Sequence, residues 1–244
     1  MADRHTAGNE ERIRRFSTYR IVEHLVLIAA FAALAVTGLP QKFYSFSISQ
    51  GIIIALGGID SVRWLHHAAG IVLGVLAAQH ILVNLIGILF LRWEPSMLVT
   101  FKDPQDALQN MRYYLGLTDT PARCGRFTYK EKWIYWLVLL GSVQMAVTGL
   151  VLWLPVVAAK YFPGQLIPAS KVIHSNEAML IFLLVVIWHI YDSVLSPDVF
   201  PLNRSIFSGY TTRKKMRQRH PLELGQVMET GEGQLGGPST ESPA

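Results

Sequence analysis

Six of the eight histidines in this 244-residue chain fall within or at the ends of long apolar blocks, where ionisable side chains are costly and rare. They are His24, His66, His67, His80, His174 and His189. A single histidine in such a block commonly forms a hydrogen bond between helices, but six together favour metal coordination. The chemistry that these residues offer is therefore ligation of a metal through imidazole nitrogen.

The spacing of the histidines places them at two depths of a helical bundle. His66 and His80 are 14 residues apart, which on an α-helix is about 40° around the axis and about 21 Å along it. His174 and His189, 15 residues apart, differ by about 60° and about 22 Å. A zinc site needs four ligands within about 2 Å of one point, which histidines so far apart cannot supply. We therefore expect two separate sites, His66 with His174 at the outer level and His80 with His189 toward the cytoplasm.

Two bis-histidine sites in a bundle of helices are what non-covalently bound haem b requires. His66 is preferred to His67 as the ligand, because 13 residues from His80 corresponds to about 220° around the helix. Small residues follow His66 on or near the same face, namely Gly70, Gly74 and Ala77, and they would let a porphyrin approach the backbone. These glycines could equally serve close packing of helices.

The elements that position the histidines are transmembrane helices. Hydrophobic residues make up 51% of the chain and charged residues 16%, against about 25% charged in soluble domains. Four blocks reach the length of about 20 residues that a span needs, Ile21–Leu39, Trp64–Leu91, Trp133–Leu154 and Val172–Leu195. A fifth stretch, Ile48–Ile59, is too short and glycine-rich, so we expect it to lie at the interface or to re-enter. The fold class is an all-α integral membrane four-helix bundle with a possible short interfacial helix.

An internal repeat relates the two halves of the chain. The residues Ala35 to Leu39 recur as Ala146 to Leu150, at an offset of 111 residues. The matching histidines of the second and fourth blocks are offset by 108 and 109 residues, which argues against chance recurrence. The chain therefore reads as a duplicated two-helix hairpin, whose halves we expect to be related by a pseudo-two-fold axis along the membrane normal.

Charge predicts the topology rather than a nucleic-acid partner, because the net charge of +5 is spread over loops. Basic residues gather before the first block, between the second and third, and after the fourth, so we expect these regions and both termini to be cytoplasmic. The expected domains are a segment 1–20, a transmembrane haem b domain 21–200, and a segment 201–244 that is disordered beyond about 221. Cys124 is the only cysteine, which excludes an intrachain disulfide, a four-cysteine iron–sulfur cluster and a covalently attached c-type haem.

Several motifs resemble a known family over roughly Arg15 to Gly209. They are Arg20, Glu23 and His24 with Thr37 and Gly38 in the first block, Arg63, Leu65 and His66 in the second, and His174, Glu177, Ala178, Trp188, His189, Tyr191, Phe200 and Pro201 in and after the fourth. This pattern resembles the cytochrome b (gamma) subunit of respiratory formate dehydrogenases and related haem b membrane anchors. The resemblance implies pairing of His24 with His189, whereas the repeat implies His80 with His189. The inner pairing therefore stays open, and the spare histidine could serve a third haem or a quinone.

The resemblance implies a subunit of the inner (cytoplasmic) membrane that transfers electrons between an extracytoplasmic partner and quinone through two or three b haems. The partner would be an iron–sulfur dehydrogenase subunit or a multihaem cytochrome c, so the chain would be part of an oxidoreductase complex and not a complete enzyme. Candidate quinone-binding donors are His24, Gln79, Asn84, Asn110, Lys132 and Gln144. The competing function is a transporter or channel whose histidines relay protons, which the pairing at two depths argues against.

Overall fold

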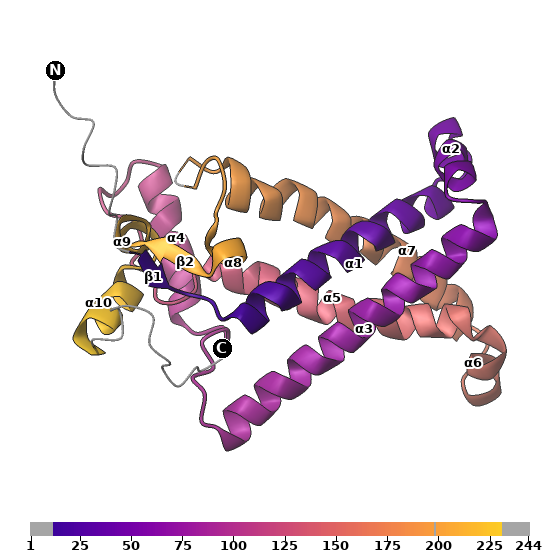
Figure 1. Cartoon of the computed structure of the whole chain (residues 1–244), viewed down its shortest axis with the longest axis horizontal. Helices are drawn as coiled ribbons and strands as arrows, with labels where there is room; N and C mark the ends of the chain where they lie inside the picture. Colours follow the sequence, from indigo (N-terminus) through magenta and orange to yellow (C-terminus); the bar gives the residue numbers. More distant parts are fainter. Residues whose placement is uncertain (1–11, 198, 231–244) are drawn as a thin grey trace. The chain divides into compact units, whose positions relative to one another are not determined.

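The computed structural model describes residues 12–197 and 199–230, and nearly all of their regular structure is helical (Figure 1). The long helices are α1 Thr18–Lys42, α3 Ile59–Phe90, α5 Tyr129–Trp153 and α7 Leu166–Leu184, which continues through the π-helical segments η1 Val185–His189 and η2 Tyr191–Leu195. Each is long and apolar enough to cross a membrane. The expected all-α membrane bundle is thus confirmed, and every predicted span matches its helix with at most one residue outside it.

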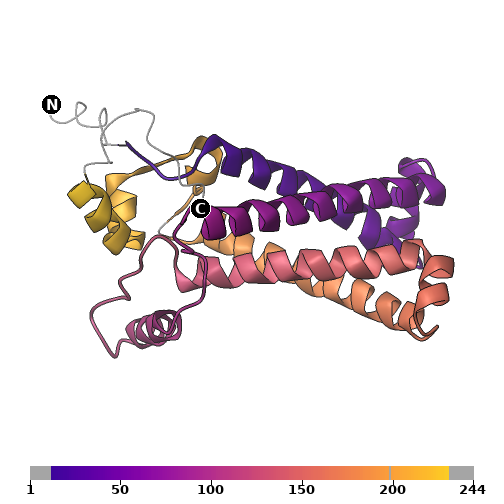
Figure 2. The same cartoon turned by 90° about the horizontal axis from the view of Figure 1, so that it is seen from below.

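Two short helices lie at the same end of the bundle (Figures 1 and 2). Helix α2, Ser47–Ala55, follows α1, and helix α6, Pro155–Tyr161, follows α5. Helix α2 ends before Gly57 and Gly58, whose φ angles of +90° and +93° are accessible to glycine at little cost and let the chain turn into α3. The short apolar stretch of the sequence is thus a nine-residue helix that is too short to span a membrane.

The spans bury few of their residues against one another. In the most apolar part of each span, the buried share is 11% for α1, 17% for α3 and α5, and none for the span of α7. Apolar side chains that face away from the protein suit a lipid surrounding, in which contact with hydrocarbon is not penalised. Sparse burial also means that the bundle is not filled by its own side chains.

The chain forms two compact units. One contains residues 22–85 and 136–193, which include the middle of all four spans and the six histidines of the apolar blocks. The other contains the described residues 12–21, 86–135 and 194–230. It holds α4 Lys102–Tyr114, α8 Ser205–Ser208, α9 Arg213–Arg219 and α10 Pro221–Thr230, and an antiparallel pair of strands, β1 Arg12–Arg14 with β2 Tyr210–Thr212.

The second unit has a small hydrophobic core of its own. Ile13, Met216 and Leu224 are buried together, and Val227 packs against them. The prediction of disorder beyond about residue 221 is therefore wrong for 221–230, because α10 buries apolar side chains against β1 and α9; residues 231–244 lie outside the described residues. The domain limits at 20 and 200 stay a prediction.

Candidate functional site

The outer pair of histidines consists of His66 on α3 and His174 on α7. Their ring centroids lie 6.3 Å apart, with an angle of 72° between the ring planes. Both rings are partly buried. The structure thus brings together the two residues that the repeat placed at equal depth.

Two threonines fix the orientation of this pair. Thr37 Oγ1 donates to the carbonyl of Ala33 at 2.7 Å and lies 2.9 Å from Nδ1 of His66. Thr148 Oγ1 donates to the carbonyl of Gln144 at 2.8 Å and lies 2.9 Å from Nδ1 of His174. Because a hydroxyl has one hydrogen, which the helix carbonyl takes, each Nδ1 must carry the proton and donate it. The lone pair of each imidazole then sits on Nε2, ready for a metal.

The glycines that follow these threonines make room for the histidine rings. A Cβ atom added to Gly38 would lie 3.1 Å from Cε1 of His66, and one added to Gly149 would lie 3.2 Å from Cε1 of His174. Both separations are tighter than ordinary van der Waals contact. The sequence analysis noted the recurring Thr-Gly but missed its role; its recurrence at a fixed distance from matching histidines was the signal.

The inner pair consists of His24 on α1 and His189 on η1. Their ring centroids are also 6.3 Å apart, with 63° between the planes. Nδ1 of His24 is buried without a hydrogen-bond partner, which is costly for a polar atom unless a ligand occupies the site. The structure thus brings His189 to the histidine that the family resemblance implied.

His80 lies elsewhere than the repeat predicted. Its Nδ1 donates to Oε1 of Glu23 on α1 at 2.9 Å, and its side chain is 19% exposed. The pairing of His80 with His189 is therefore not what the structure contains. The repeat places residues at equal depth, but α1 supplies a histidine at this depth that α5 does not.

His67 also has a separate environment. Its ring stacks on Trp153, with centroids 4.5 Å apart and 23° between planes. These two residues line a surface pocket of about 450 Å³ together with Asp60, Arg63, Trp64, Ala68 and Ile71. The choice of His66 over its neighbour agrees with this placement.

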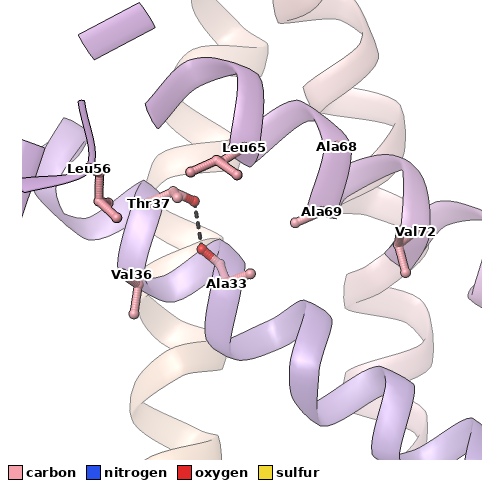
Figure 3. A pocket seen from close by; sticks show the side chains of 8 residues that line it. All are labelled: Ala33, Val36, Thr37, Leu56, Leu65, Ala68, Ala69 and Val72. Carbon is pink, nitrogen blue, oxygen red and sulfur yellow. Dashed lines mark hydrogen bonds between the residues drawn. The ribbon is translucent and has the colours of Figure 1, made fainter. Parts of the chain in front are cut away.

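An apolar pocket of about 360 Å³ adjoins the outer pair (Figure 3). Thr37 and Leu65 line it, together with Ala33, Val36, Leu56, Ala68, Ala69 and Val72. Figure 3 shows the Thr37 hydroxyl directed along α1 to the carbonyl of Ala33, so the polar group of this lining is engaged within the helix.

The six candidate quinone donors are not gathered in one place. Asn110 and Lys132 lie in the unit with α4, where Asn110 accepts from the backbone of Ala122 and Lys132 forms a 3.0 Å ion pair with Asp103. Gln144 donates to Glu177, one turn from the outer histidine pair, so it lies at the outer level and not the inner one as expected. His24, Gln79 and Asn84 remain near the inner level, with Asn84 bonded to the backbone carbonyl of His80.

Comparison with known proteins adds the family. Residues 82–208, just over half of the chain, match the family described as prokaryotic cytochrome b561. The chain belongs to this family. It is therefore a multi-pass membrane cytochrome b that functions in electron transfer, with haem b as its cofactor, and a proton-relay transporter or channel is not favoured.

Relatives of this cytochrome b561 family member cover most of its length. It is 22% identical to the formate dehydrogenase cytochrome b556(fdo) subunit of Escherichia coli strain K12, over 91% of this chain and 96% of the relative. It is 24% identical to the formate dehydrogenase cytochrome b556 subunit of Haemophilus influenzae, over 88% and 83%. A third relative, the nitrate-inducible cytochrome b556(Fdn) subunit of Escherichia coli strain K12, is 22% identical over 81% and 83%. The resemblance predicted from the motifs is confirmed.

The two histidine pairs of this cytochrome b have the geometry that a haem needs. Metal–imidazole bonds of about 2 Å, with each nitrogen about 1.2 Å from its ring centre, separate two rings on one metal by about 6 Å. Both pairs are at 6.3 Å. The protonated Nδ1 of each outer histidine and the unpartnered Nδ1 of His24 also suit ligation. The residues present therefore fit haem iron at two levels.

Proposed function

We propose that this cytochrome b is the membrane subunit of a respiratory oxidoreductase complex, carrying electrons between an extracytoplasmic dehydrogenase and quinone. Two b haems would be bound, one by His66 and His174 and one by His24 and His189. Each bound haem supplies one-electron redox chemistry. The observation that carries the proposal is the pair of equal ring separations, 6.3 Å, at two levels of one bundle.

The residues of the chain set where the electrons can reside. His174 and His189 are 15 residues apart, which corresponds to about 22 Å along a helix and so to most of the thickness of the hydrocarbon core. Thr37 and Thr148 hold the outer rings, and the apolar spans around them exclude water. An electron entering at the outer level can therefore be passed on to the inner level within the protein.

The partner is proposed from the relatives and from charge. The relatives are subunits of formate dehydrogenases, which favours an iron–sulfur dehydrogenase over a multihaem cytochrome c as the electron donor. The basic residues around α4 and α9 support a cytoplasmic location for the unit containing both, and so an inner-membrane protein with both termini inside. Substrate chemistry would take place in the partner, and this chain would not be a complete enzyme.

The quinone site is proposed at the inner level, next to the pair formed by His24 and His189. Glu23 precedes His24 in sequence and accepts a hydrogen bond from His80. These polar groups lie among apolar spans, which is the combination that a quinone head group and its apolar tail require. The engagement of His80 by Glu23 also supports two haems rather than three.

The test is a haem count by pyridine haemochrome assay on the purified full chain and its variants. We expect two haems per chain, loss of one in His24→Ala or His189→Ala, and loss of the other in His66→Ala or His174→Ala. His80→Ala should keep both haems and lower quinone reduction, whereas the matched variant His67→Ala should keep both properties. A colourless protein would refute the proposal, and loss of haem in His80→Ala but not in His24→Ala would restore the pairing predicted by the repeat.

A further inference from the structure

The two histidine pairs differ in the partners of their Nδ1 atoms. At the outer level, both Nδ1–H groups donate to a threonine, at 2.9 Å from Thr37 and 2.9 Å from Thr148. At the inner level, Nδ1 of His24 is buried without a hydrogen-bond partner. The difference arises because the recurring Thr-Gly ends α1 and α5 at the outer level only.

A hydrogen bond from Nδ1 changes what the other ring nitrogen gives to a metal. When Nδ1–H donates, negative charge builds up on the imidazole and Nε2 becomes a more basic ligand. A more basic ligand stabilises ferric iron more than ferrous iron, because the ferric ion has the larger charge. Ligand basicity and hydrogen bonding are thus levers on the reduction potential of haem.

Each threonine can accept this bond without cost to its own donor. Its hydroxyl hydrogen is held by a helix carbonyl, Ala33 for Thr37 and Gln144 for Thr148. The oxygen lone pairs therefore point away from the helix toward the imidazole. Thr37 and Thr148 are 3% and 7% exposed, so water does not compete strongly for the acceptor.

Neighbouring charges do not explain the same difference. A carboxylate lies next to each level, Glu177 three residues after His174 and Glu23 next to His24. Gln144 donates to the first and His80 to the second. Negative charge near either haem acts in the same direction, so the threonines are the feature that distinguishes the two levels.

We propose that Thr37 and Thr148 are positioning residues that lower the reduction potential of the outer haem and make it the lower-potential haem of the two. The inference rests on the proposed function, since it requires haem at both histidine pairs. It adds a driving force from the outer level to the inner one, written into a repeated Thr-Gly pair.

The experiment is a spectroelectrochemical redox titration of the purified full chain and of Thr37→Val and Thr148→Val. Each valine keeps the shape of threonine but removes the acceptor. We expect the outer haem to be reduced more easily, with its reduced-to-oxidised ratio at fixed ambient potential raised about two- to tenfold, and the inner haem unchanged. Thr37→Ser and Thr148→Ser keep the hydroxyl and should titrate as the wild type does. The matched control is Val147→Ala, an exposed neighbour of Thr148.

A second measurement does not depend on the valine variants retaining haem. His24→Ala removes the inner haem, and the remaining haem must titrate at the lower of the two wild-type potentials. An outer haem at the higher potential, or valine variants with unaltered potentials and intact haem, would overturn the inference while leaving the two-haem function in place. Absence of haem from the wild-type protein would instead overturn the proposed function.

Discussion

The second contact of each ring distinguishes histidines that look alike in the sequence. His66 and His67 are neighbours on α3, yet the first donates to Thr37 and the second stacks on Trp153. His80, on the same helix, donates to Glu23. Only the first of these three rings faces another histidine, with its Nε2 lone pair available. Ligation is thus determined by what holds Nδ1 as much as by the position of the residue.

The glycines opposite the outer pair provide a prediction at this scale. Gly38→Ala and Gly149→Ala would each place a Cβ within 3.1–3.2 Å of an imidazole carbon, so the ring must shift away from its place opposite the other histidine. We expect weaker retention of the outer haem by about tenfold, measured as haem lost on dilution in detergent, with the inner haem unaffected. Gly51→Ala, where an added Cβ meets nothing within 4 Å, is the control and should behave as the wild type. Equal haem loss in all three variants would contradict the role of the two glycines.

The outer pair could be predicted from the sequence, and the inner pair could not. Helical periodicity gives the depth of a residue and its angle on its own helix, which sufficed for His66 and His174. At the inner level, His24 and His80 have similar depths, and the rotation of one helix relative to another decides between them. That rotation depends on tertiary packing, and here it pairs His80 with Glu23.

At the scale of the element, the π-helical segment η1 accounts for an irregularity in the repeat. The histidines of α3 are 14 residues apart and those of the last span 15, so the second copy has one extra residue. A π-helical turn closes its hydrogen bond over one more residue than an α-helical turn. The extra residue is absorbed in Val185–His189, directly before the inner ligand candidate. Sequence periodicity assumed a uniform helix and therefore overestimated the angle between His174 and His189.

The spans were predictable because length and hydropathy suffice to define them, whereas α10 was not. Residues 221–230 contain few apolar side chains, which by composition indicates disorder. The structure buries Leu224 and packs Val227 against Ile13 and Met216, over 200 residues away or on the preceding helix. A contact of such separation leaves no trace in local composition.

The junction of α4 and α5 offers a prediction about an element. Lys132 and Asp103 are each 8% exposed and lie 3.0 Å apart. Burial raises the pKa of Asp103, but hydrogen bonds from Thr100 and Lys132 outweigh it and bring the pKa below its ordinary value. Asp103→Ala leaves a buried lysine without this carboxylate, so we expect a loss of about 3–5 kcal/mol in the stability of the unit that contains α4.

Thermal unfolding of the purified chain, followed by cysteine labelling of buried Cys124, measures this loss. The matched control is Asp106→Ala, which breaks a more exposed pair with Lys102 and should cost no more than about 1 kcal/mol. The double variant Asp103→Ala with Lys132→Met should recover most of the stability, because the unpaired charge is removed. Similar costs for Asp103→Ala and Asp106→Ala would show that burial of the pair is unimportant.

At the scale of the whole molecule, segments from both ends of the chain and from the second connection form one unit. Strands β1 and β2 pair Arg12 with Thr212, and the guanidinium of Arg15 donates to the carbonyl of Arg126 at 2.6 Å. Arg15 is also within 4 Å of carboxylate oxygens of Glu131 and Glu223. These buried charges join segments far apart in sequence, so this unit depends on the ionisation of its members.

His220 makes this unit sensitive to acid. Its Nδ1 donates to the carbonyl of Gly125 at 2.9 Å, and its side chain is 2% exposed. Burial, with the nearby Arg15 adding to it and Glu131 opposing it, lowers the pKa of His220 from 6.5 to about 4. The unfolded chain therefore binds a proton in this window that the folded chain does not, and stability must fall as the pH drops from 6.5 toward 4, by up to about 3 kcal/mol.

Thermal unfolding followed across this pH range checks the effect of His220. Burial raises the pKa of Glu223, so that carboxyl takes up its proton more readily in the folded state and works in the opposite direction. The comparison is therefore made with His220→Gln, which can donate to the same Gly125 carbonyl but does not titrate. We expect the wild type to lose stability between pH 6.5 and 4 by more than the glutamine variant does. Parallel pH profiles for the two proteins would mean that His220 is not the acid-sensitive group and that another buried charge near Arg15 controls the unit.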